Sequence, residues 1–386
     1  MEDSVKDATE QQKKMIVSWD EMIEKALENF GWTQFLQCIL VSVVMFFDSQ
    51  QLFIGIYTDH YPTWHCTNHT TTCTSNSDIC KLQKSSWEWD GPSSKTIISQ
   101  FGLECVSSFI TGLPQSSFFF GCLLGSFLLA TMADTYLGRK NIIVLSCLSM
   151  SVISIVIIFS TNVWIYSALK FLIGFCRSCI STCCLVLLTE KVSTKWRFTV
   201  AIIQFVFFTS GYMFLPGVAY ANRNSPWKYL YVWTSVPAIF YSFIAYLCVT
   251  ESPRWLLMQG RVKEAMEMLK GVNENAANLN PAEEPLAEEK KVSFCELYSS
   301  IVVLLRRSWA RKRMVGVMGL GLGIGMVYYG MPLAVGNLNY NIYIAVVLNA
   351  LMEIPSCVVT YFLRNCERKL SILVFSVGSG ICCIVW

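Results

Sequence analysis

The chain has 386 residues, of which 53% are hydrophobic and only 15% are charged, and its formal net charge is +3. Soluble domains are typically about a quarter charged and less apolar, so this composition excludes an ordinary soluble protein. The hydrophobic residues gather in runs of about 20, the length that crosses roughly 30 Å of hydrocarbon as a helix. Because backbone polar groups in lipid must be bonded internally, we expect an all-α membrane protein.

The chain begins with a polar segment, residues 1–33, which we expect on the cytoplasmic side. Ser18 and Glu21 fit a capping box ahead of apolar residues at helical spacing. This pattern predicts a short amphipathic helix, lying either on the inner membrane surface or in solvent. The first span is predicted over residues 33–56. Asp48 lies inside it and either faces a cavity or a partner, as ionisable residues at that depth usually do, or is wetted near the outer end.

A long polar loop, residues 57–113, follows the first span. Four cysteines and a glycosylation acceptor at Asn68 indicate the oxidising side of the membrane and two disulfides. Four cysteines allow three pairings, among which the sequence does not choose. Three histidines lie in the same loop, but the spacing matches no standard zinc pattern, and we expect no metal. The residues concerned are Cys66, Cys73, Cys80, Cys105, His60, His65 and His69.

Five more spans are predicted in the N-terminal half, so residues 34–250 should form a six-helix bundle. These spans cover residues 113–133, 141–161, 163–188, 198–218 and 229–249. Basic residues concentrate in alternate turns between the spans, and the positive-inside rule makes those turns cytoplasmic. This orientation agrees with the disulfides and the glycan expected in the first loop.

A polar stretch, residues 251–313, is predicted to be a cytoplasmic linker between two halves. The seventh span, residues 314–331, is rich in glycine, which permits close packing or a helix break at a substrate site. An eighth span covers residues 341–363, and a ninth begins near Ser371. Residues 314–386 would therefore form only part of a second bundle.

Two charged turns occupy corresponding places in the two halves: residues 133–140 after span two and residues 364–369 after span eight. They resemble the signature loops of the major facilitator superfamily. Residues 84–92 resemble the plant organic cation/carnitine branch, and three further stretches are similar to the organic cation/anion transporter family. Those three are Thr189-Glu190 with Lys195-Trp196-Arg197, Glu251-Ser252-Pro253-Arg254-Trp255-Leu256-Leu257, and Tyr328-Tyr329-Gly330 with Gly336-Asn337-Leu338.

The resemblance runs from about residue 34 to the end and implies a major facilitator fold, with a six-helix N-terminal half and an incomplete C-terminal half. The chain departs from the family pattern at Thr135, where arginine is usual, and in the four-residue step from Asp134 to Gly138. We expect this change to loosen the turn. The family has twelve spans and this chain reaches the ninth, so we expect either a truncated product or a partial gene product, or a chain to which the family mechanism does not apply.

The resemblance implies a secondary transporter of small organic cations or zwitterions, such as carnitine or a polyamine. It would work by alternating access in the plasma membrane or, alternatively, the vacuolar membrane. Symport with a proton or sodium ion stays open, with Asp48 and Glu353 as candidate carriers. No cofactor is implied, and no catalytic cluster of an enzyme is found. The expected cytoplasmic gate residues are Asp134, Gly138, Arg139, Lys140, Glu190, Arg197, Glu251 and Arg254.

Candidate substrate residues follow from the chemistry of an organic cation, which aromatic faces and a carboxylate or amide hold in a low-dielectric site. By resemblance, Gln204 and Tyr329 match positions near the family's central site. Ordinary helix packing is the alternative for the aromatic residues, whereas a functional role is favoured for Glu353 because lone membrane carboxylates are rare. The candidates are Gln204, Phe207, Phe208, Tyr328, Tyr329, Glu353 and Asp48.

Two other functions stay open. A related porter of an organic anion or a sugar would share the fold, and its selectivity would depend partly on the spans that the chain is expected to lack. A non-transporting membrane protein could instead associate with a full-length relative, because a partial C-terminal bundle leaves a glycine-rich face without a partner helix.

Overall fold

The computed structural model shows a helical protein with eight helices that are long and apolar enough to cross a membrane in the part of the chain it describes. It describes residues 21–28, 30–67, 73–74, 77–133, 137–272, 302–303, 305–335, 341–365 and 367–385. Two expected sites, the glycan at Asn68 and the gate residue Asp134, lie outside the described residues, as do Thr135 and the stretch 336–338.

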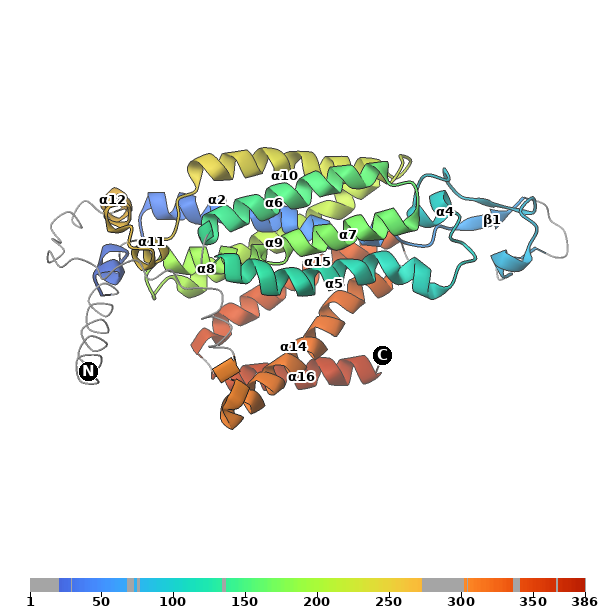
Figure 1. Ribbon diagram of the computed structural model, residues 1–386. Helices are drawn as coiled ribbons and strands as arrows, with labels where there is room; N and C mark the ends of the chain where they lie inside the picture. Colours follow the sequence, from blue (N-terminus) through green and yellow to red (C-terminus); the bar gives the residue numbers. More distant parts are fainter. Residues whose placement is uncertain are drawn as a thin grey trace.

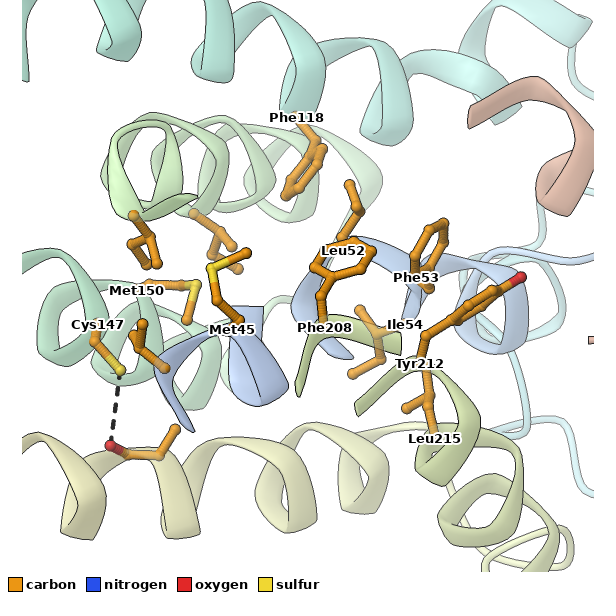
Figure 2. Packing of buried hydrophobic residues seen from close by; sticks show 14 of the residues in the cluster. Met45, Leu52, Phe53, Ile54, Phe118, Cys147, Met150, Phe208, Tyr212 and Leu215 are labelled. Carbon is orange, nitrogen blue, oxygen red and sulfur yellow. Dashed lines mark hydrogen bonds between the residues drawn. The ribbon is translucent and has the colours of Figure 1, made fainter. Parts of the chain in front are cut away.

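The N-terminal half is an elongated bundle in which α2 occupies the interior (Figure 1). Its membrane helices are α2 (Trp32–Phe53) continued by α3 (Gly55–Thr58), α5 (Ser108–Met132), α6 (Gly138–Val156) continued by the 3₁₀ turn η3 (Ile157–Phe159), α7 (Val163–Arg177), α8 (Ile180–Glu190), α9 (Arg197–Ala221) and α10 (Lys228–Cys248). Figure 2 shows Met45 and Phe53 of α2 packed among residues of its neighbours, including Phe118 and Tyr212. The six-helix N-terminal half expected from the sequence is confirmed.

The fourth span differs from its prediction as one continuous helix over residues 163–188. It consists of two helices, α7 and α8, which meet at Ser178 and Cys179. The Ser178 hydroxyl donates a hydrogen bond of 2.9 Å to the Phe175 carbonyl. A serine that bonds back to its own helix in this way commonly bends it.

Close contact between α5 and α7 depends on glycine. A Cβ added at Gly174 would overlap the carbonyl of Phe118, and one added at Gly121 would overlap the carbonyl of Phe171. Small residues at such crossings let helix backbones approach each other, which is the main source of packing between helices in lipid.

We therefore expect Gly174→Ala to lower the free energy of unfolding by about 1–3 kcal/mol, because an added methyl group forces the helices apart. Gly217→Ala is the matched control, since a Cβ at Gly217 meets nothing within 4 Å. Thermal unfolding of the two purified variants in detergent makes the comparison. Equal unfolding temperatures would contradict the close α5–α7 crossing.

The loop between α3 and α5 contains a small two-stranded sheet, which departs from a purely helical expectation. Strands β1 (Trp64–Cys66) and β2 (Trp87–Trp89) pair antiparallel, with Trp64 opposite Trp89. The short helices η1 (Ile79–Lys81) and α4 (Ile97–Phe101) complete the loop. Of the three pairings that the sequence allows, the structure joins Cys66 to Cys73 and Cys80 to Cys105.

The opposite end of the bundle carries the helices of the linker and the N-terminal segment (Figure 1). Residues 21–26 are helical, and Ile23 and Leu27 pack with Leu269 in one apolar cluster. The linker helices are α11 (Pro253–Met258) and α12 (Val262–Val272). The sequence left two positions open for this amphipathic helix, the inner membrane surface and free solvent. Neither describes residues 21–27, because their apolar side packs on α12.

The C-terminal half consists of α14 (Ser308–Val335), α15 (Ile342–Phe362), the turn η5 (Leu363–Asn365) and α16 (Arg368–Val385). Helix α14 begins inside the stretch assigned to the linker, so the basic residues 311–313 belong to its first turns. Helix α15 packs along α9, whereas α14 diverges from the N-terminal bundle toward the end that carries α11 and α12 (Figure 1). The expected partial major facilitator arrangement is confirmed.

Candidate functional site

A carboxylate at the junction of the two halves is the centre of the candidate site. Glu353 of α15 is half-buried, and its Oε1 accepts a hydrogen bond of 2.7 Å from the Tyr328 hydroxyl of α14. Its Oε2 accepts one of 2.6 Å from the Thr209 hydroxyl of α9. In the described part of the chain, no basic side chain forms an ion pair with Glu353. Its negative charge therefore has hydroxyl donors but no counter-charge there.

Aromatic and amide groups lie one turn away from this carboxylate. Asn349, on the same helix, donates a hydrogen bond of 3.1 Å to the Tyr212 hydroxyl of α9. The Tyr212 ring packs on Phe53 with 4.0 Å between the ring centroids. Phe208, a predicted substrate residue, also packs on Phe53, with 6.2 Å between the ring centroids, and lies in the core (Figure 2). Phe208 therefore takes part in ordinary helix packing, the alternative that the sequence left open for the aromatic candidates.

A second membrane carboxylate, Asp48 of α2, is fully buried and carries a counter-charge. Arg177 at the end of α7 binds it with both arms of the guanidinium, Nε to Oδ1 at 2.8 Å and Nη2 to Oδ2 at 2.6 Å. The hypothesis that Asp48 is wetted near the outer end of the span is wrong, because its side chain is 0% exposed. Such bidentate pairs are among the stronger polar contacts in proteins.

A third charged group lies nearer the loop end of the bundle. The Lys170 ammonium of α7 is 3.6 Å from Asp59 and faces the rings of Tyr166 and Tyr231. The Tyr166 hydroxyl donates a 2.7 Å bond to the other oxygen of Asp59. The sequence analysis missed both Lys170 and Arg177. The signal was present, since basic residues inside an apolar span are rare and usually have a partner.

The remaining predicted substrate residues separate into different places. Tyr329 packs on Phe119 of α5, with 5.3 Å between ring centroids, and interacts electrostatically with Asp48 and Arg177. Gln204 is buried in the N-terminal half, where its amide donates a 3.0 Å bond to the Ser181 carbonyl.

The structure thus brings Tyr328 to Glu353 and Tyr329 toward the Asp48–Arg177 pair, whereas Gln204 contacts neither carboxylate.

Phe207, another predicted substrate residue, is partly buried and packs against the core. Thr209 was missed as well, because a threonine in an apolar helix gives no signal in sequence.

Most of the expected gate residues meet at the end of the N-terminal half that lies opposite the disulfide-bonded loop. The Glu251 carboxylate accepts hydrogen bonds of 3.1 Å from the backbone amides of Arg139 and Lys140, and so caps α6. Gly138 has φ +80°, and a Cβ there would overlap Glu251, so glycine is required. The Arg139 guanidinium is also 3.5 Å from Glu190.

Two further gate candidates bind a residue that the sequence analysis did not single out. Arg197 and Arg254 lie 3.7 and 3.4 Å from Glu24 of the N-terminal segment. The Thr194 amide donates to the same carboxylate. Partial burial opposes ionisation of Glu24, but the Thr194 bonds and the two guanidinium groups together lower its pKa. These contacts tie the N-terminal segment to the ends of α9 and α11.

Comparison with known proteins gives consistent matches over nearly the whole chain. The sequence pattern of the family described as sugar (and other) transporter matches residues 64–386. Organic cation/carnitine transporter 2 of Arabidopsis thaliana is 44% identical, and the match covers 94% of this chain and 72% of that protein. Organic cation/carnitine transporter 3 of the same plant is 45% identical, with 94% and 72% covered.

Among solved structures, the proton:xylose symporter XylE of the major facilitator superfamily, bound to 6-bromo-6-deoxy-D-glucose, is similar in fold. The TM-score is 0.57 at 15% sequence identity, and the match covers 88% of this chain and 70% of that protein. At this identity the similarity concerns the arrangement of helices and carries nothing about the solute.

Proposed function

The chain belongs to the sugar (and other) transporter family of the major facilitator superfamily, among its organic cation/carnitine transporters, and from this premise we propose that it carries a small organic cation or zwitterion across a membrane. The family consists of multi-pass membrane transporters and not of enzymes. Carnitine-like and polyamine-like solutes are the proposed substrates. The observation that carries the proposal is Glu353, a membrane carboxylate with two hydroxyl donors and no basic partner among the described residues.

Electrostatics favours Glu353 over Asp48 as the group that meets the cation. Two opposite unit charges 4 Å apart attract each other by about 4 kcal/mol at an effective dielectric constant of roughly 20. A cation at Asp48 would have to displace Arg177 from a bidentate contact, whereas at Glu353 it would meet an uncompensated charge. The hydroxyls of Tyr328 and Thr209 would hold the carboxylate in position for it.

Alternating access is the proposed mechanism, with the two halves rocking about the Glu353 cluster. Near the loop end the halves are in contact, because the Tyr343 ring stacks on Tyr57 at 5.6 Å and meets the edge of Tyr220 at 5.5 Å. Toward the other end α14 diverges from the bundle (Figure 1). We propose that Asp134 and the gate contacts around Glu251 and Glu24 control closure at that end.

We propose Asp48 and Glu353, the two membrane carboxylates singled out in the sequence, as candidate carriers of a coupled proton or sodium ion. Uptake measured with an imposed pH gradient and, separately, with a sodium gradient would identify the ion. We propose the plasma membrane as the location, with the disulfide-bonded loop and the glycan at Asn68 on the outer face. Imaging of a fluorescent fusion would distinguish the plasma membrane from the vacuolar membrane.

Uptake of labelled carnitine and spermidine into cells that express this chain tests the proposal. We expect saturable uptake of one of them. Tyr329→Ala should raise its KM roughly 2- to 30-fold, the range for losing one cation–π contact, because the Tyr329 ring lies 5.2 Å from the ring of Tyr328, which binds Glu353. Tyr229→Ala, at an exposed ring on α10, is the matched control.

Labelled p-aminohippurate and xylose provide the opposing outcomes in the same cells. Saturable uptake of either, without carnitine or spermidine, would indicate the organic anion or sugar porter. No uptake of any of the four, with the protein present at the cell surface, would indicate the non-transporting form.

A further inference from the structure

A cavity of about 250 Å³ lies at the cytoplasmic end of the N-terminal half, away from Glu353. The N-terminal segment, the start of α2, the end of α8, and helices α11 and α12 form its walls. Leu27, Pro253, Met268 and Leu269 supply apolar surface. Gly271 at its rim is exposed, so solvent reaches the rim.

One charged side chain lines this cavity. Lys191 directly follows α8 and is 7% exposed. Its ammonium donates hydrogen bonds of 3.0 Å to Gln37 Oε1 and 2.8 Å to Thr250 Oγ1. Both acceptors are neutral, and no carboxylate of the described residues forms an ion pair with Lys191. A buried ammonium without a counter-charge is unfavourable, so a bound anion would stabilise it.

The charged groups around Lys191 do not supply that anion. Glu251, between α10 and α11, is the nearby acid, but its oxygens accept from the backbone amides of Arg139 and Lys140. Glu24 of the N-terminal segment is held by two arginines at the ends of α9 and α11.

The other titratable groups near Lys191 do not favour its charge strongly. Cys38 of α2 would favour the charged form of Lys191 only as a thiolate, and the positive charge of Lys140 of α6 disfavours that charged form. The cavity residues of α12, which include Met268 and Leu269, carry no charge. Burial is the largest effect and lowers the pKa of Lys191 to about 7, while Glu251 opposes it.

We propose that this cavity binds an apolar monocarboxylate, with its carboxylate at the Lys191 ammonium and its body against Leu27, Met268 and Leu269. One ammonium matches one negative charge, and the apolar walls match a hydrocarbon body rather than a phosphate or a sugar. The ligand comes either free from the cytosol or as a fatty acid from the inner leaflet. Either source presents the same carboxylate and chain to the cavity.

The binding should depend on pH with a defined sign. The anion stabilises the charged form of Lys191, so binding is strongest below pH 7 and weakens as the lysine loses its proton. With a pKa of about 7, the charged fraction falls about 30-fold between pH 6 and pH 8.5, and the affinity should fall by the same factor.

Calorimetric titration of octanoate into the full chain, in nanodiscs of uncharged lipid, tests the site. We expect saturable binding of octanoate, and none of octanol, which lacks the charge, or acetate, which lacks the chain. Lys191→Met should weaken binding at least about tenfold, the scale of one hydrogen bond to a charged group. Gly271→Phe should weaken it by filling the rim, and Gly271→Ala should not, since a Cβ at Gly271 meets nothing within 4 Å.

If Lys191→Met fails to fold, Gly271→Phe and Gly271→Ala still test the site, because both leave the lysine in place. Absence of saturable octanoate binding, or binding that is independent of pH and unchanged by the folded variants, would overturn the proposal. Oleate placed in the nanodisc lipid distinguishes the source. Competition with octanoate indicates a fatty acid from the leaflet, and no competition indicates a free cytosolic carboxylate.

Discussion

Replacing Glu353 with glutamine should lower uptake of the transported cation by roughly 10- to 100-fold, the scale of one hydrogen bond or contact to a charged group. Glutamine keeps the shape and can still bond to Tyr328 and Thr209, but it removes the negative charge. The loss should therefore appear in uptake and not in protein abundance. Initial uptake rates, corrected for surface protein, measure it.

The control for this charge is Glu267→Gln, at an exposed carboxylate of α12. It should leave uptake unchanged. Thr209→Val adds a test of positioning, since it removes one hydrogen bond to Glu353 and keeps the charge, so its effect should be smaller than that of Glu353→Gln. Full uptake by Glu353→Gln would show that the cation binds elsewhere, and would refute the site proposed here.

Breaking the Asp48–Arg177 pair should have the largest effect on stability. Removing one member of a buried ion pair leaves the other charge without compensation and costs about 3–5 kcal/mol. Asp48→Asn and Arg177→Leu should each lower the unfolding temperature of the purified protein markedly. Replacing a buried pair with apolar residues of similar size is often neutral, so the double variant Asp48→Leu/Arg177→Met should recover most of the loss.

The double variant also separates structure from transport. If Asp48 carries the coupled ion, the double variant will be stable but will lose uptake driven by an ion gradient. If Asp48 has only a structural role, uptake will persist. Single variants that unfold at the same temperature as the unaltered chain would contradict the bidentate contact between Asp48 and Arg177.

The sequence predicted the helical spans well because the signal is local. An apolar run of sufficient length must be a helix in lipid, whatever its neighbours are. The break in the fourth span escaped prediction because both of its halves are apolar, and the hydroxyl of Ser178 acts only through its own backbone contact. The small sheet of the loop between α3 and α5 was missed for a different reason. Its strands, β1 and β2, are only three residues long, too short for a periodic pattern.

The candidate site was only partly predictable. Glu353 stood out because a lone carboxylate in an apolar helix is rare, and Tyr328 followed from its aromatic side chain. Thr209 gave no such signal, and the sequence shows Lys191 only as one of the basic residues in the turn between the fourth and fifth spans. Its burial depends on how α2, the segment between α10 and α11, and α12 pack around it, which no local pattern reveals.

The sequence by itself determined that this chain crosses a membrane repeatedly and to which family of transporters it is similar. Only the tertiary structure decided which charges meet. Arg177 compensates Asp48 across 129 positions of the chain, whereas Glu353 meets the Thr209 hydroxyl across 144 and has no basic partner among the residues that the structure describes. The physical reason is geometric: one residue turns a helix by about 100°, so the face that each side chain presents is set by how whole helices pack.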